Sequence, residues 1–281
     1  MPKVPTAILL ATLLAASGSA PGAEKVASLP PTDIGRLNVA YSIAFWSVPI
    51  GGTSFDIHLR PTGYTTSSHF ETSGIISAFW QSIIDASSTG QLSPHGVSPT
   101  LYDSFYRRGQ KHQRVKLTYA ADGMPTTVAD PPYNQNKYPV TDAQKKEGLD
   151  PLGAATAVLA GIHESADNPC GTVAPVFDGR RRYNIEFTWL RDEDVKLDNG
   201  LYSGKAHLCQ LHYNQIAGFK PKILKEGRAL PPAFGWFAEI PSAAAPNGHY
   251  LLPLKLWTST GFGTATATLS QMKIEDNHVK G

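Results

Sequence analysis

The dipeptide Asp178-Gly179 lies between two runs of residues that favour extended structure. Asp-Gly readily takes positive φ at both central positions of a two-residue β-hairpin turn. The run that follows alternates between two faces, one with Arg181, Tyr183, Ile185, Phe187 and Trp189 and the other with Arg182, Asn184, Glu186 and Thr188. A period of two is typical of a half-buried strand, so the sequence predicts an antiparallel hairpin with a tight turn at Asp178-Gly179.

Similar alternating runs recur along the chain and are separated by turn residues. They lie at residues 37–46, 55–60, 64–70, 99–107, 113–119, 204–213, 250–256 and 264–270. The 25 glycines and 22 prolines fall mostly between such runs, and neither an internal repeat nor a linker divides the chain. The predicted fold class is mainly β, with one antiparallel sheet of roughly ten or more strands that must curl into a half-barrel or β-spiral around a helix.

Two segments predict short helices. In residues 75–84, six large apolar side chains recur at four-residue spacing and would form one helical stripe: Ile75, Ile76, Phe79, Trp80, Ile83 and Ile84. In the second segment, Asp150 is a suitable N-cap, Pro151 suits the first helical position, and residues 152–162 are rich in alanine and leucine. The stretch 122–141 is polar, contains four prolines and is predicted to be a long loop.

The first 22 residues have the order of a secretory signal peptide, with Lys3 before the apolar run 8–16 and small residues after it. That apolar run is too short to span a bilayer. No cysteine lies near the expected cleavage site, so acylation is not expected. We therefore expect a signal peptide at 1–22, a flexible leader at 23–35 and one domain at 36–281, exported to the periplasm as a soluble protein without a membrane span.

Composition and charge exclude some functions. The chain has 25 basic and 23 acidic residues, a formal net charge of +2, and no basic run long enough to bind a polyanion, so no nucleic-acid partner is expected. The nucleophile elbow Gly-x-Ser-x-Gly, the zinc motif His-Glu-x-x-His and the phosphate-binding loop are all missing from the sequence. The sequence therefore predicts neither a cofactor nor catalytic residues, although a triad assembled only in space would escape such a search.

Cys170 and Cys209 are the two cysteines of the chain. In an exported protein two cysteines most often pair, so a disulfide is the favoured interpretation. The alternative is a metal site in which His207, Cys209 and His212 act together with Cys170. In a strand, however, His207 and Cys209 would share a face and His212 would lie on the other. The sequence thus favours the disulfide and predicts no metal.

Several of these segments together resemble a known family of exported proteins from Gram-negative bacteria, the domain-of-unknown-function family 3108. The resemblance rests on Tyr41–Gly51, Asp150-Pro151, Cys170, Pro175–Tyr183, Cys209, Tyr213 and Gly218. It covers nearly the whole expected mature chain, and the run from Phe177 to Tyr183 is its most specific part. The family has no established reaction. A looser analogy to periplasmic lipoprotein carriers implies a half-barrel around a helix with an apolar cavity, which concerns the fold and does not fix a function.

The candidate ligand-binding residues are Trp46, Phe79, Trp80 and Arg180. Taken singly, such aromatic residues are more typical of a core, but the apolar stripe of a helix on a curved sheet is also where a hydrophobic cavity would form. Arg180 belongs to a run of three arginines that could bind an anionic head group, but consecutive strand residues face opposite ways, which favours ordinary surface pairs.

The leading hypothesis is a non-enzymatic periplasmic protein that binds a lipid, an acyl chain or an envelope partner and supports cell-envelope maintenance. The alternatives are a structural interaction module with a filled core and a hydrolase whose triad is assembled in space.

Overall fold

A computed structural model describes residues 33–74, 77, 81–134, 137–162, 168–170, 173–226 and 231–277 of the chain. The predicted signal peptide and residues 23–32 of the predicted leader lie outside these ranges. The described residues form one 13-stranded sheet in which neighbouring strands are antiparallel. This confirms the predicted fold class.

The strands are β1 (Gly35–Phe45), β2 (Val48–Arg60), β3 (Gly63–Thr72), β4 (Ser82–Ser93), β5 (Gly96–Arg108), β6 (Lys111–Tyr119), β7 (Pro125–Asp130), β8 (Val173–Phe177), β9 (Arg182–Lys196), β10 (Ser203–Ala217), β11 (Ala233–Pro241), β12 (His249–Thr260) and β13 (Gly263–Asp276). The helices are α2 (Asp142–Glu147), α3 (Pro151–Leu159) and α4 (Pro221–Glu226). Among the described helices, none is long and apolar enough to cross a membrane.

Strand order follows the chain except at one junction. The order is β7-β6-β5-β4-β3-β2-β1-β13-β12-β11-β10-β9-β8, so the first and last strands pair in the middle of the sheet. Strands β7 and β8 form the two edges. The backbone of Leu149, just before α3, bonds to Pro175 and Phe177 and so covers part of the free edge of β8. Covering an exposed edge in this way limits pairing with other chains.

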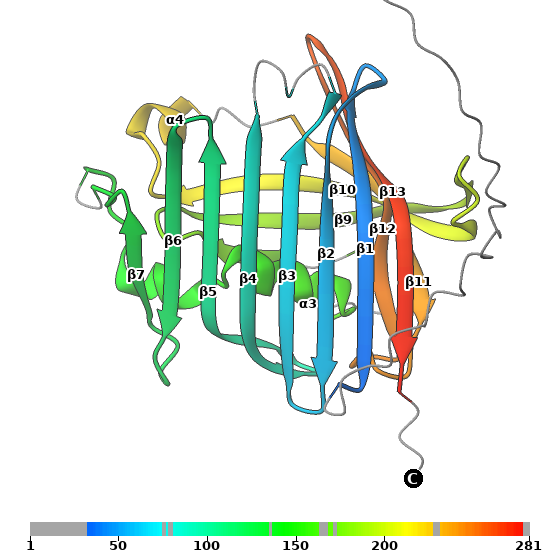
Figure 1. Ribbon diagram of the computed structural model, residues 1–281, viewed down its shortest axis with the longest axis horizontal. Coiled ribbons are helices and arrows are strands. Elements are labelled where there is room, and N and C mark those ends of the chain that lie inside the picture. The colour runs from blue at the N-terminus through cyan, green and yellow to red at the C-terminus, as the bar shows by residue number, and fades with distance from the viewer. Residues whose placement is uncertain are drawn as a thin grey trace, which may run out of the picture.

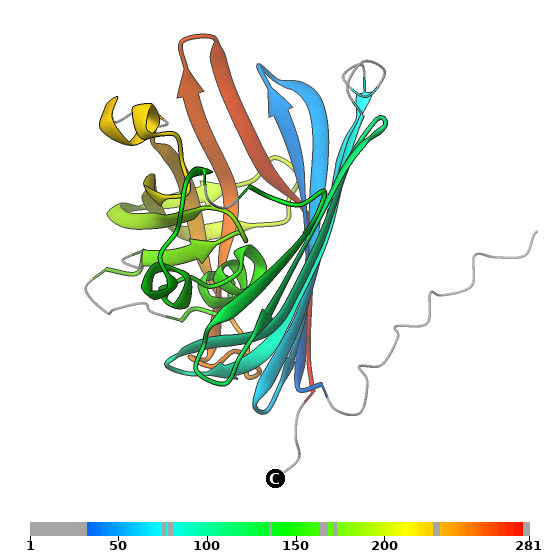
Figure 2. The same ribbon diagram turned by 90° about the vertical axis from the view of Figure 1, so that its left-hand side faces the viewer.

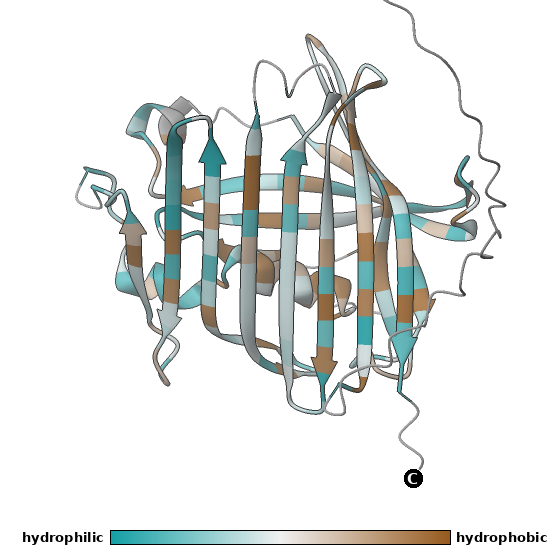
Figure 3. Ribbon diagram, viewed as in Figure 1, coloured by the Kyte–Doolittle hydropathy of each residue, from teal (hydrophilic) through white to brown (hydrophobic). Residues whose placement is uncertain are grey.

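The sheet curls around α3. Figure 1 shows β1 to β7 as a broad face with β9 and β10 crossing behind it, and Figure 2 shows α3 between these two parts. The helix contacts β3, β4, β5, β8 and β12. Hydropathy alternates along many of the strands, as Figure 3 shows, because one face of the sheet lies towards this interior. The second predicted helix is therefore the one that the sheet wraps.

The prediction of a helix over residues 75–84 is wrong for its last three residues. Ser82, Ile83 and Ile84 begin β4, in which Ile84 pairs with Phe70 of β3 on one side and Tyr106 of β5 on the other. Pairing on both sides satisfies the backbone there, and a short apolar run does not by itself distinguish helix from strand. Residues 75, 76 and 78–80, which include Phe79 and Trp80, lie outside the described residues.

The prediction that residues 122–141 form one long loop is also wrong. Pro125–Asp130 form the edge strand β7, which pairs with β6. A proline is tolerated as the first residue of an edge strand because its missing N–H need not join the ladder. Helix α2, capped by Thr141 and Gln144 in a capping box, follows shortly after and was not predicted.

The predicted hairpin at Asp178 is confirmed, but its turn is longer than predicted. Phe177 pairs with Arg182, so the connection spans the four residues 178–181 instead of two. Asp178 Oδ1 accepts hydrogen bonds from the backbone N–H groups of Arg180 and Arg181, at 2.9 and 2.7 Å. Gly179 has φ +89°, as its predicted role requires. Because Arg180 and Arg181 belong to this connection, neither takes part in the predicted alternation of the strand.

Helix α3 is fixed to the sheet by buried polar contacts at its N-terminal half. Asp150 is its N-cap, as predicted, and accepts hydrogen bonds from the N–H groups of Leu152 and Gly153. Its second carboxylate oxygen accepts a hydrogen bond from Ser88 of β4, at 2.9 Å. One turn further along, the hydroxyls of Thr156 and Thr66 lie 2.6 Å apart. These contacts determine which face of α3 is directed towards β3 and β4.

Strands β1, β2, β12 and β13 have two unlike ends. At the closed end, where β1 begins and β13 finishes, fully buried side chains fill the interior: Leu37, Val39, Ile57, Leu59, Leu252, Leu254 and Leu269. The open end carries the β1–β2 and β12–β13 turns, and there the inward-facing side chains of Ile43, Phe45 and Ala265 are only partly buried. Packing density thus falls along the strands from one end to the other.

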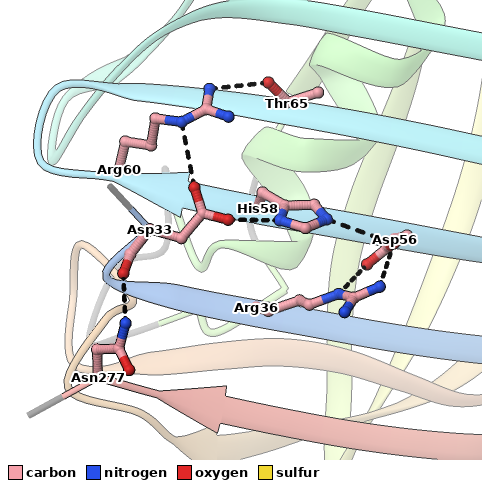
Figure 4. Close-up of polar contacts among 7 residues, drawn as sticks. All are labelled: Asp33, Arg36, Asp56, His58, Arg60, Thr65 and Asn277. Atoms are coloured by element: carbon pink, nitrogen blue, oxygen red, sulfur yellow. Dashed lines mark hydrogen bonds and ion pairs between the residues drawn. The ribbon is translucent and has the colours of Figure 1, made fainter. Parts of the chain in front are cut away.

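A polar cluster on the sheet strengthens the closed end, as Figure 4 shows. Asp33, whose side chain is fully buried, bonds to His58 Nδ1 at 2.5 Å and lies 3.1 Å from Arg60 Nε. Arg36 binds Asp56 through two hydrogen bonds of 2.7 Å each. Burial acts to raise the pKa of Asp56, but the hydrogen bonds and charge of Arg36 outweigh it and hold the pKa below its usual value. The cluster fixes the start of the described chain to β2.

Candidate functional site

An apolar hollow of about 380 Å³ lies between the sheet and α3, on the open-end side of the core. Strands β1 and β2 contribute Tyr41, Thr53 and Phe55, while β12 and β13 contribute Pro253, Leu256 and Ala267. None of the residues that line the hollow is charged. Its volume falls within the range of roughly 300–1,000 Å³ that is usual for small-molecule sites. The hollow is therefore the candidate functional site.

The hollow exists because helix α3 has small side chains where it faces the sheet. Ala154, Ala155 and Val158 form its wall on this side. Protein interiors are usually packed as densely as organic crystals. Small side chains opposite a curved sheet therefore leave a volume that larger side chains would fill. Sequence reasoning missed these residues, because an alanine-rich helix gives no signal that distinguishes close packing from a cavity.

The opposite wall is the β9 face that the period-two pattern predicted. Tyr183, Ile185 and Phe187 all line the hollow, together with Phe237 of β11. The rings of Phe187 and Phe237 meet edge to face with centroids 5.8 Å apart. Tyr183 packs against Tyr213 outside the lining, with centroids 4.7 Å apart. Aromatic packing of this kind gives the wall a fixed shape.

The predicted disulfide joins Cys170 to Cys209 and lies directly behind this wall. Both cysteines are fully buried and pack with Phe237 and Leu251. Since the two sulfur atoms are bonded to each other, neither is available to the metal site considered as the alternative. His207, which also belongs to that set, forms an ion pair with Asp192 instead, with its Nδ1 atom 2.7 Å from Asp192 Oδ1.

One residue of the lining carries a polar group that the protein leaves unpaired. Tyr41 is 5% exposed, and its buried hydroxyl oxygen has no hydrogen-bond partner within the described residues. Burial raises the pKa of Tyr41 above its usual value, so the phenol stays protonated. A buried polar group without a partner is costly and needs an explanation. The hydroxyl oxygen is inaccessible, so a ligand in the hollow would contact the ring of Tyr41 and not its hydroxyl.

The residues predicted to bind a ligand are not gathered at this hollow. Trp46 lies in the β1–β2 turn at the open end and is 68% exposed. Arg180 lies in the connection before β9, packs over the ring of Tyr133 and lines a separate hollow of about 120 Å³ together with Lys145. Of the four predicted residues, neither of these two belongs to the apolar lining, and Phe79 and Trp80 are outside the described part of the chain.

A second hollow of about 420 Å³ lies near the other side of α3. It shares Ala154, Val158 and Ala174 with the first one but also includes the polar residues His95 and Glu147. The two hollows differ in character, because only the first is lined by apolar side chains almost throughout. The second is therefore less suited to an apolar ligand.

The antiparallel sheet curls around a short helix, and its edge strands β7 and β8 do not pair with each other. This architecture places the chain among β-barrel-like proteins. Residues 38–270 match the family described as "Protein of unknown function (DUF3108)", and the chain belongs to that family. The match confirms the resemblance drawn from the sequence. No curated protein matches the chain significantly.

One similar solved structure is described as the crystal structure of a beta-barrel-like protein of domain of unknown function DUF1849 from Brucella abortus. The alignment has a TM-score of 0.52 at 12% sequence identity and covers 87% of this chain and 100% of that chain. At such low identity the likeness shows a shared fold alone.

Proposed function

We propose that this protein is a non-enzymatic periplasmic binding protein whose hollow takes an acyl chain or the apolar part of a lipid. The single observation that carries the proposal is a hollow of about 380 Å³ lined by apolar and aromatic side chains without a charged residue. Burial of apolar ligand surface there stabilises a complex by roughly 25 cal/mol for each Å² removed from water. The predicted signal peptide supports the location, and support of the cell envelope follows from location and ligand class together.

The hydroxyl of Tyr41 does not narrow the ligand class, because this oxygen is inaccessible although the residue lines the hollow. A ligand would contact the ring of Tyr41. Tyr41→Phe keeps the ring and removes the unpaired hydroxyl, so we expect it to leave the binding of a fatty acid unchanged. The free energy of unfolding of the empty protein should not fall in this variant.

The direct test is binding of a fluorescent fatty-acid analogue, with organic extraction and mass spectrometry of the protein as secreted. Ala155→Trp adds a large side chain in the lining and should abolish saturable binding. Ala243→Trp is the matched control, because Ala243 is exposed in the loop between β11 and β12 and is not part of the lining. Fractionation should recover the protein in the periplasm and not in the cytoplasm.

Three outcomes would count against the proposal. The wild-type chain could show no saturable binding and carry no extractable apolar compound, in which case the filled structural module is the better reading. Ala155→Trp could bind as well as the wild type, which would place the ligand elsewhere. Recovery in the cytoplasm would contradict the location.

The hydrolase alternative has less support in the described residues. Ser88 contacts Asp150 and Tyr64, but no histidine joins their hydrogen bonds within this part of the chain. His58 bonds to Asp33 in the polar cluster of the closed end, and neither residue lines the hollow. Hydrolysis of an ester by the purified protein would favour this alternative over the binding protein.

A further inference from the structure

The two hairpin turns at the open end expose large apolar side chains next to each other. Trp46 and Val48 of the β1–β2 hairpin are 68% and 50% exposed, and Phe262 of the β12–β13 turn is 83% exposed. The turns are joined by a hydrogen bond of 3.0 Å from the N–H of Trp46 to the carbonyl of Thr264. The indole of Trp46 also lies against Gly263, where a Cβ atom would collide with it. We call Trp46, Val48 and Phe262 the tip patch.

The backbone under the tip patch is strained. Trp46 and Ser47 both have positive φ, +49° and +65°, in a turn that normally selects Asn-Gly. Left-handed backbone costs free energy at each residue with a Cβ atom. Burial of the indole does not offset this cost, because most of the indole is exposed. Strain that internal packing does not explain points to a role for Trp46 outside the folded chain.

Charge is missing from both hairpins that carry the tip patch. Residues 37–55 and 256–272 contain no aspartate, glutamate, lysine, arginine or histidine, although 17% of the chain is charged. Charged side chains return at the closed end of the same strands, where the cluster of Arg36, Asp56 and His58 lies. A tip without charges can enter the boundary between lipid head groups and acyl chains without desolvating an ion.

An apolar path connects the tip patch to the hollow. On the inward face of β1, Tyr41 lines the hollow, and Ile43 and then Phe45 follow towards the turn. On the paired strand β13, Ala267 lines the hollow and Ala265 lies opposite Phe45. The ring of Phe45 stacks on that of Trp46, with centroids 5.8 Å apart. An apolar surface is thus continuous from the exposed patch to the interior.

We propose that the tip patch docks on a phospholipid bilayer, with Trp46 and Phe262 inserted at the level of the head groups. Tryptophan is favoured at that level because its ring is apolar and its N–H can still form a hydrogen bond. Three side chains on two narrow turns are far smaller than the surface of roughly 800 Å² per partner that a stable protein interface buries. A few inserted aromatic side chains are sufficient for reversible membrane binding. Docking does not require that the hollow be occupied.

The test is flotation of the secreted protein with phosphatidylcholine vesicles and with vesicles that also contain phosphatidylglycerol, at low and high salt. We expect binding to both, with little loss at high salt, because the tip patch has no basic residue. Trp46→Ser combined with Phe262→Ser should weaken binding by about tenfold or more, since each change removes an aromatic side chain that would leave water. Val128→Ser is the matched control, because Val128 is 64% exposed on the edge strand β7.

Unchanged melting and unchanged binding of the fatty-acid analogue by the double variant would show that fold and hollow are intact, so this test is separate from that of the proposed function. The wild-type chain could fail to float with either vesicle, or the double variant could bind like the wild type, and either result would overturn docking. Binding lost at high salt would overturn it as well. Self-association removed by the double variant, without wild-type flotation, would make the patch a protein interface instead.

Discussion

The closed end and the open end of β1, β2, β12 and β13 are built from the same strands but differ in packing. At the closed end, Leu37, Leu254 and Leu269 are fully buried and an ion-pair cluster covers one side. At the open end, Ala267 and Leu256 border a hollow, and the turns expose Trp46 and Phe262. Stability is therefore concentrated at one end and accessible apolar space at the other.

The largest expected effect concerns the disulfide, which braces the wall of the hollow where packing is loose. Replacing Cys170 and Cys209 by alanine should lower the free energy of unfolding by about 4 kcal/mol, because the bond closes a loop with a sequence separation of 39 residues. Urea denaturation without reductant measures the change. Reductant should destabilise the wild type and leave the double variant unaffected. A loss well under half of this value would mean that the open end does not depend on the cross-link.

A pair of leucines on β12 compares the two ends directly. Leu254→Ala should cost about 3 kcal/mol, because Leu254 is fully buried and its removal leaves an enclosed cavity. Leu256→Ala should cost less than half as much, because Leu256 already borders the hollow and is only partly buried. Urea denaturation of both variants decides the matter. Equal costs would show that the hollow is not open space in solution.

Asp150, which holds α3 against β4, makes stability depend on pH. Burial raises the pKa of Asp150 to about 6, against the opposing hydrogen bonds from Gly153, Ser88 and Leu152. The usual value in an unfolded chain is about 3.9. The folded state therefore keeps this proton to higher pH than the unfolded state.

The contribution of Asp150 to the free energy of unfolding should be greatest below about pH 4. It should fall by roughly 2 kcal/mol as the pH rises to about 6. Asp150→Asn can keep the cap but cannot titrate. The difference in the free energy of unfolding between wild type and Asp150→Asn should therefore change over this window and be constant above it. A difference that does not vary with pH would show that Asp150 ionises normally in the fold.

The smallest expected effect is a gain in stability from a change at the open end. Replacing Trp46-Ser47 by Asn-Gly should raise the free energy of unfolding by about 1 kcal/mol, because these residues accept the left-handed backbone with less strain. Thermal melting measures the gain, and vesicle flotation should show that membrane binding is weakened in the same variant. A loss of stability would mean that Trp46 contributes packing to the turn.

Rules based on nearby residues, such as strand alternation and helix capping, predicted those parts of the fold that depend only on neighbouring positions in the chain. The alternation of Tyr183, Ile185 and Phe187 identified a strand face that lines the hollow. Asp150-Pro151 located the start of α3, since cap geometry depends on neighbouring residues only. The same rules failed at Ile83 and Ile84, where pairing with β3 and β5 decides the structure. They failed at β7 as well, whose few residues form a strand only because β6 lies beside them.

The sequence by itself determined the fold class, the hairpin around Asp178, the second helix and the pairing of the cysteines. Each of these depends on short-range periodicity, on backbone preferences or on the scarcity of cysteine. Only the tertiary structure decided that β1 pairs with β13, that the sheet curls around α3 and that alanines there leave an apolar hollow. Volume is a property of side chains from distant segments that meet in space, so no single stretch of sequence records it.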